Sequence, residues 1–116
     1  MTDAKDFWDY VDALIAGSRL VIDRPKGSHH PRYSAIVHPL DYGYLEGTAS
    51  MDGGGIDVWR GSGDPRQVAG VICTVDMLKR DSEVKVILGC SDEEVQTILR
   101  FLNEGYMRAL LFRRPA

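Results

Sequence analysis

The spacing of apolar residues predicts a helix near the N-terminus of this 116-residue chain. Apolar side chains recur every three to four positions across residues 3–16, and Gly17 follows as a typical C-terminal stop. Polar residues occupy most of the remaining positions, so the helix is amphipathic. The apolar positions are Phe7, Trp8, Val11, Leu14 and Ile15.

Short strands and loops follow this helix. Residues 19–24 alternate like a strand, and a loop containing Pro25 and Pro31 separates them from a second strand signal over residues 33–37. Residues 38–55 contain five glycines and a proline, which predict an irregular segment until a strand begins at Ile56. Loops carried by a rigid scaffold commonly hold functional residues.

The C-terminal half predicts a hairpin and a second helix. Residues 67–75 and 84–90 are strongly apolar and are joined by a charged segment. Ser91 and Glu94 then form a capping-box pattern that opens a helix ending near Gly105. The tail over residues 106–116 is compatible with a helix or a last strand. Short strands with one helix near each end predict a mostly antiparallel barrel or curved sheet with external helices.

Composition limits the class of protein. A chain of this length with 44% hydrophobic residues can bury one modest core, so we expect a single domain over residues 1–116. The net charge of −3 and the pI near 5.5 disfavour a nucleic-acid partner. Cys73 and Cys90 lie in apolar contexts and are expected to be buried thiols. No segment predicts a signal peptide or membrane span, so we expect a cytoplasmic protein.

Acidic residues provide the candidate chemistry. Asp52 and Asp57 flank three consecutive glycines, and Mg²⁺ prefers such oxygen ligands, usually one or two carboxylates together with phosphate oxygens. A hairpin that curls over the same end of the sheet would add further carboxylates and bring Lys85 to a phosphate oxygen. The additional acidic candidates are Asp76, Asp81 and Glu83, and the other phosphate-binding candidates are Lys26, Arg32, Tyr42 and Tyr106.

Each candidate also has an ordinary structural interpretation. An aspartate beside glycine is a common turn residue, and a charged hairpin tip is usually solvated. His29, His30 and His38 suit a transition metal, but neighbouring histidines in a Pro/Gly loop are more often exposed to solvent. Trp8 and Trp59 are expected to be core or subunit-interface side chains.

The ordered segments resemble the soluble family I inorganic pyrophosphatases. The matching segments begin with VIDRPKG, PRY and HPLDYGYLEGTASMDGGGIDV, and continue with GVICTVD, EVKV and FLNEGY. They run from Leu20 to Tyr106, in the order and approximate spacing of that family. The resemblance implies a small OB-like five-stranded antiparallel barrel with two external helices, dependence on Mg²⁺, and hydrolysis of inorganic diphosphate to two phosphates.

The resemblance also implies roles for individual residues. Asp52 and Asp57 match the outer aspartates of a DGDPxD motif and would be catalytic metal ligands. Further metal ligands would be Asp23, Asp76 and either Asp81 or Glu83. Substrate-binding residues would be Arg32, Tyr42, Lys85, Tyr106 and Arg108.

Three departures from the family pattern affect the expected activity. Gly54 replaces the middle aspartate, which helps to deprotonate the attacking water, and a segment carrying a phosphate-binding arginine is missing between Tyr33 and His38. Met107 replaces a lysine, although Arg108 is adjacent. The alternative to an active enzyme is therefore a diphosphate-binding or sensing module of the same fold. An OB-like nucleic-acid binder is disfavoured by the acidic balance, and a homo-oligomer is expected.

Overall fold

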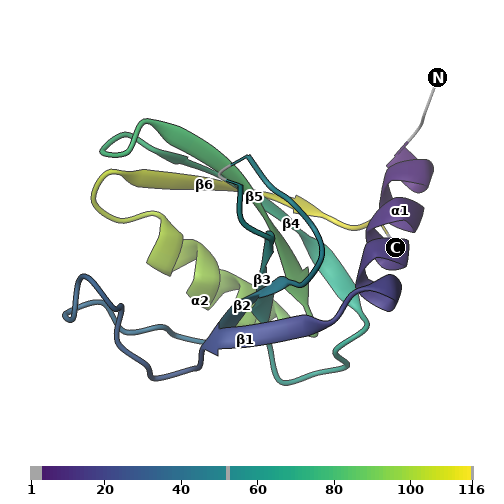
Figure 1. Ribbon diagram of the computed structural model, residues 1–116, viewed down its shortest axis with the longest axis horizontal. Coiled ribbons are helices and arrows are strands. Elements are labelled where there is room, and N and C mark those ends of the chain that lie inside the picture. Colours follow the sequence, from purple (N-terminus) through teal and green to yellow (C-terminus); the bar gives the residue numbers. More distant parts are fainter. Residues whose placement is uncertain (1–3, 52, 116) are drawn as a thin grey trace.

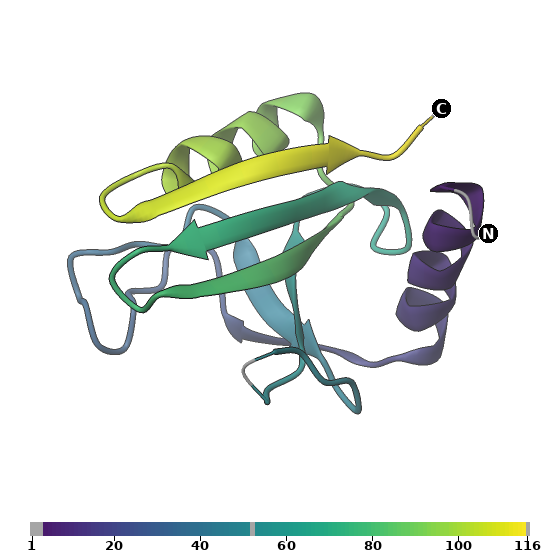
Figure 2. The ribbon, with the colours of Figure 1, turned by 90° about the horizontal axis from the view of Figure 1, so that it is seen from above.

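A computed structural model describes residues 4–51 and 53–115 and shows one twisted sheet with a helix on each face (Figures 1 and 2). The strands are β1 (Leu20–Arg24), β2 (Asp41–Leu45), β3 (Ile56–Arg60), β4 (Val68–Asp76), β5 (Asp81–Leu88) and β6 (Met107–Arg113). The helices are α1 (Ala4–Gly17) and α2 (Asp92–Leu102). None of the described helices is long and apolar enough to cross a membrane.

The sheet differs from the expected five-stranded antiparallel barrel. It has six strands in the order β1-β2-β3-β5-β4-β6, and β3 pairs with β5 in parallel. The tail forms the sixth strand, β6, along β4. In the described part of the chain the outer strands β1 and β6 do not pair with each other, so the sheet stays open. The prediction of a mostly β fold with two flanking helices is confirmed, and the prediction of a closed barrel is wrong.

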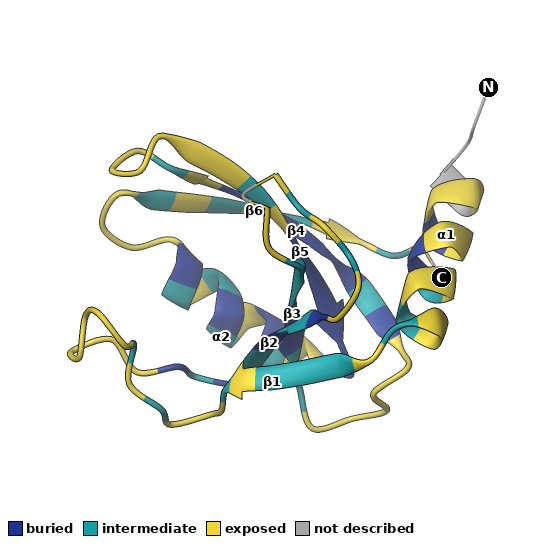
Figure 3. Cartoon of the chain, viewed as in Figure 1, coloured by how far each residue is buried: buried dark blue, intermediate teal, exposed yellow. Residues whose placement is uncertain are grey.

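Two hydrophobic clusters lie on opposite faces of the sheet (Figure 3). Successive strand residues point to opposite faces. Val86 therefore packs in the cluster covered by α1, and its neighbour Ile87 packs in the cluster covered by α2. The same division separates Val58 from Trp59 and Val71 from Ile72 in the two adjacent strands. Burial on both faces explains why consecutive positions are apolar where these strands cross the core, as at Val58–Trp59, Val71–Ile72 and Val86–Leu88.

Local signals located most elements correctly. The predicted N-terminal helix, the strand over residues 19–24, the strand at Ile56 and the hairpin correspond to α1, β1, β3 and β4–β5. The capping box at the start of α2 is confirmed, because the Ser91 hydroxyl accepts the Glu94 N–H and the Glu94 carboxylate accepts the Ser91 N–H. Cys73 and Cys90 are free thiols and are half-buried rather than buried.

Two strand predictions in the first half are wrong. Residues 33–37 form a turn, in which the Ile36 N–H donates to the Tyr33 carbonyl, and only Val37 makes an isolated bridge, to His29. The segment predicted to be irregular contains β2. Position 43 of this strand needs a glycine because β1 approaches β2 closely there. A Cβ on Gly43 would overlap the carbonyl oxygen of Val21.

We predict that Gly43→Ala lowers the free energy of unfolding by more than about 2 kcal/mol, because backbone of β1 must move away from β2. Gly17→Ala is the matched control, since its added Cβ has no neighbour within 4 Å. Urea denaturation followed by circular dichroism measures both. Equal stability of the two variants would show that the β1–β2 approach is not constrained at Gly43.

Candidate functional site

The candidate site lies on the face of the sheet that α2 covers only in part. Directly paired residues share a face, and the pairings Tyr44–Asp57 and Asp57–Lys85 place side chains from three adjacent strands together. Farther along the same face, the pairing Trp59–Ile87 lies in the apolar cluster with α2. The face is therefore apolar beneath α2 and polar beyond it.

Lys85 is the centre of the polar region. Its residue is only 4% exposed, and its ammonium nitrogen Nζ lies 2.8 Å from Glu83 Oε2, 3.2 Å from Asp57 Oδ2 and 2.7 Å from the Tyr42 hydroxyl oxygen. The two carboxylate side chains are about one-fifth exposed. One buried cation thus joins side chains from β2, β3 and β5, and all three of its N–H bonds have acceptors.

Charge and burial act in opposite directions on Lys85. Burial by itself would lower the pKa of the Lys85 ammonium, but Tyr42 and the carboxylates of Asp57 and Glu83 outweigh it, so the pKa lies above its ordinary value of 10.5. Burial raises the pKa of Tyr42 despite the neighbouring ammonium. At neutral pH Lys85 is therefore charged and Tyr42 keeps its hydroxyl proton.

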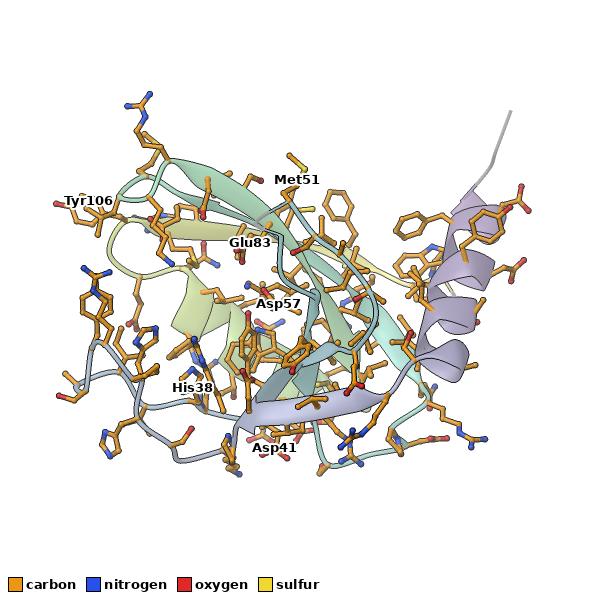
Figure 4. All side chains as sticks on the ribbon, in the orientation of Figure 1. His38, Asp41, Met51, Asp57, Glu83 and Tyr106 are labelled. Carbon is orange, nitrogen blue, oxygen red and sulfur yellow. The ribbon has the colours of Figure 1, made fainter. Side chains whose placement is uncertain are left out.

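A cavity of about 650 Å³ opens beside this cluster. Of the predicted site residues, Asp23, Tyr42, Asp57, Asp76, Glu83, Lys85 and Tyr106 line it. Figure 4 shows Asp57 and Glu83 near the middle of the sheet, His38 on the side of α2 and Tyr106 toward one end of the molecule.

Other predicted residues lie elsewhere. Arg32 and Asp81 are exposed and do not line the cavity, and the Arg108 guanidinium donates to the backbone carbonyls of Gly105 and Met107. Asp76 lines the cavity but also accepts the backbone N–H groups of the following turn. The predicted ligand Asp52 lies outside the described residues.

The arrangement of carboxylates limits how a metal could bind. Within residues 4–51 and 53–115, no three His, Cys, Asp or Glu side chains are grouped closely enough to hold an ion together. Lys85 already occupies the space between Asp57 and Glu83. The oxygen donors facing the cavity suit a hydrated Mg²⁺ held by one or two carboxylates, which is the usual mode for that ion with phosphate ligands.

Histidine and aromatic side chains form a second part of the lining, which the sequence patterns did not identify. The loop histidines were expected to face solvent; His29 is exposed, but His30 is half-buried and His38 is buried. The His38 Nδ1–H donates to the Ser28 carbonyl at 3.2 Å, and its ring stacks near Tyr42 with 6.0 Å between centroids. Phe101 of α2 packs against both His38 and Trp59. The only sequence signal was the density of rings in residues 29–38.

We predict that Lys85→Met lowers the free energy of unfolding at pH 7 by about 3 kcal/mol, because it leaves two partly buried carboxylates without their cation. The raised pKa of Lys85 stabilises the folded state fully below pH 10.5, and this contribution is lost as the pH rises through the folded-state value. The stability difference between the two proteins should therefore shrink only at strongly alkaline pH.

Arg19→Met is the matched control, because Arg19 pairs with Glu46 at an exposed position. Denaturant unfolding of the three proteins across pH 6–11 measures the difference. A Lys85→Met protein as stable as the control at pH 7 would show that the ammonium does not compensate Asp57 and Glu83.

Comparisons with known proteins identify the fold. Neither a family model nor a curated protein matches the sequence. Among solved structures, an inorganic pyrophosphatase from Neisseria gonorrhoeae superposes with a TM-score of 0.61 at 18% identity, covering 82% of this chain and 81% of that one. An inorganic pyrophosphatase from Helicobacter pylori gives 0.57 at 18% identity, covering 83% and 82%. One from Coxiella burnetii gives 0.51 at 15% identity, covering 81% and 82%. The structure therefore has the fold of the family I inorganic pyrophosphatases, as the sequence resemblance implies.

Proposed function

We propose that this protein is a Mg²⁺-dependent hydrolase that cleaves inorganic diphosphate to two phosphates. The observation that carries the proposal is the convergence of Tyr42, Asp57, Glu83 and Lys85 beside one cavity. These four residues come from three strands and match the positions that the family resemblance assigns to metal and phosphate binding. The shared fold supports the proposal, and the low sequence identity leaves the activity to be measured.

The chain's own residues would bind and orient the phosphates. The Lys85 ammonium and the protonated Tyr42 hydroxyl supply positive charge and a neutral donor to phosphate oxygens. The Asp57 and Glu83 carboxylates would hold Mg²⁺, with Asp76 nearby on the same lining and Asp52 as a further ligand. The ion, when bound, neutralises charge on the phosphates and makes a coordinated water more acidic. Asp57 can accept a proton from the attacking water.

The second candidate is a module that binds diphosphate without turnover. Two observations favour it: Lys85 neutralises the best-placed carboxylates, and Gly54 contributes no carboxylate. Losing one positioned base typically costs about 10² to 10⁴ in rate. Saturable diphosphate binding without phosphate release above background would establish this alternative. The cytoplasmic location, the homo-oligomer and the single domain stay predictions.

We predict that Asp57→Asn and Glu83→Gln each lower Mg²⁺-dependent phosphate release from diphosphate by at least about 100-fold, because each removes a charge at the metal and phosphate site. Asp81→Asn is the matched control, since Asp81 is exposed and outside the cavity lining. Colorimetric phosphate assays with and without Mg²⁺ measure the rates. Full turnover by Asp57→Asn would refute the site.

We predict that Gly54→Asp raises the turnover number, because it restores a carboxylate at the family position that helps to deprotonate the attacking water. Gly54 is exposed and does not have a positive φ, so its backbone accepts a side chain. Gly54→Asn is the control, because it adds a side chain of the same size at the same position without the carboxylate. If neither variant is faster than the natural chain, the missing base does not limit the rate.

A further inference from the structure

The cavity is larger than its charged part requires. Its volume of about 650 Å³ lies in the range of about 300–1,000 Å³ that encloses drug-sized organic ligands. The charged cluster around Lys85 occupies one region of the lining. The rest is built by the loop between β1 and β2, the tip of the β4–β5 hairpin, the end of α2 and the turn after it. Apolar and aromatic residues dominate this second region, and they include Tyr33, Ile36, Leu78, Phe101 and Tyr106.

Two tyrosines of this region are exposed to solvent. Tyr33 is 46% exposed, and Tyr106 is 67% exposed. The Tyr33 ring packs on His30 with 5.3 Å between ring centroids, and the Arg32 guanidinium carbon lies 5.6 Å from its centroid. A backbone bond from the Met77 N–H to the Tyr106 carbonyl connects the hairpin tip with the turn that carries Tyr106. Exposed aromatic rings on a cavity wall are surfaces on which planar heteroaromatic rings stack.

His30 adds a hydrogen-bond donor to the same wall. Its Nδ1 accepts the backbone N–H groups of Arg32 and Tyr33, each at 3.1 Å, so Nδ1 carries no proton. The hydrogen of the neutral ring is then on Nε2, for which the described residues provide no acceptor. A ring nitrogen or carbonyl oxygen of a nucleobase is such an acceptor, whereas an aliphatic chain is not.

The charges of the lining agree with an esterified diphosphate. Its fixed cations are Arg24, Lys79 and Lys85, and Lys85 is already paired with Asp57 and Glu83. The lining also carries the carboxylates of Asp23, Asp76 and Glu104, so positive charge is scarce in the cavity. A diphosphate ester has one ionisable oxygen fewer than inorganic diphosphate and so needs less positive charge. The same cavity offers it a wall for the esterified group.

We propose that this site binds nucleoside diphosphates in preference to inorganic diphosphate, with the base against Tyr33 and His30 and the phosphates at Lys85 and Tyr42. The reaction assigned to this ligand, hydrolysis of its phosphoanhydride bond, rests on the proposed function. Water adds to the terminal phosphorus and the anhydride P–O bond breaks. The nucleoside monophosphate leaves with the bridging oxygen, and orthophosphate and one proton are released.

Calorimetric titration in the presence of Mg²⁺ tests the ligand class without requiring turnover. The probes are α,β-methylene-ADP, methylenediphosphonate and its methyl ester, none of which contains a cleavable anhydride. We expect the nucleoside analogue to bind at least about tenfold more tightly than the other two. Tyr33→Ala should remove most of this preference and Tyr33→Phe should keep it, because the ring face supplies the contact.

Tyr10→Ala is the matched control, since Tyr10 is also an exposed tyrosine, at 73%, but lies on α1 and does not line the cavity. Equal binding of the three probes, or a preference that survives Tyr33→Ala, would overturn the proposal. Phosphate release from ADP and from inorganic diphosphate separates the two ideas. Preferential binding of the nucleoside analogue without any turnover would contradict the proposed hydrolysis but not the proposed ligand class. Turnover of inorganic diphosphate without any preference for ADP would contradict the ligand class but not the hydrolysis.

Discussion

The site depends on a single buried ammonium group and the three acceptors that surround it. Removing a charged amine from water is costly, and Lys85 stays charged only because β2, β3 and β5 deliver Tyr42, Asp57 and Glu83 to within hydrogen-bond distance. The parallel pairing of β3 with β5 sets Asp57 directly opposite Lys85. Strand register therefore determines the electrostatics of the cavity.

In the proposed function, the same ammonium would set the balance between phosphate and metal binding. It would attract phosphate oxygens, and its ion pairs reduce the negative charge that Asp57 and Glu83 could offer to a cation. A metal ion held by so few free carboxylates keeps most of its water and gains its remaining ligands from the bound phosphates. Metal and substrate would then bind with positive coupling, because each supplies ligands or charge that the other needs.

Local sequence patterns predicted what depends on neighbouring residues. The capping box at Ser91 and the apolar strand around Val86 were predicted correctly because their signals lie within a few residues. Strand β2 was not predicted, because a glycine within a strand usually indicates a break. Only the tertiary structure shows that Val21 of β1 packs so closely that Gly43 is required there. The family resemblance supplied most of the candidate site residues, whose roles stay predictions. It left Asp81 and Glu83 as alternatives for a metal ligand, which stays a prediction; the structure places Glu83 beside Lys85 in the cavity lining and leaves Asp81 outside it.

The part of the cavity lining that comes from the loop between β1 and β2, which carries His30 and His38, could not be predicted for a related reason. The position of His38 near Tyr42 and Phe101 follows from how the loop folds back over α2, which no short-range pattern encodes. The expectation of solvent-facing histidines used loop composition; it holds for His29, and tertiary packing overrode it at His30 and His38. The partly aromatic cavity is thus a property of the fold as a whole.

The pKa of Lys85 tests the central claim most directly. Selective ¹³C labelling of lysine Cε, with Lys85→Arg to assign the signal, allows its titration to be followed by NMR in the folded protein. The account predicts a midpoint above the ordinary value of 10.5, because Tyr42, Asp57 and Glu83 together outweigh burial. A midpoint below 10.5 would mean that burial dominates and that the three acceptors do not hold the ammonium.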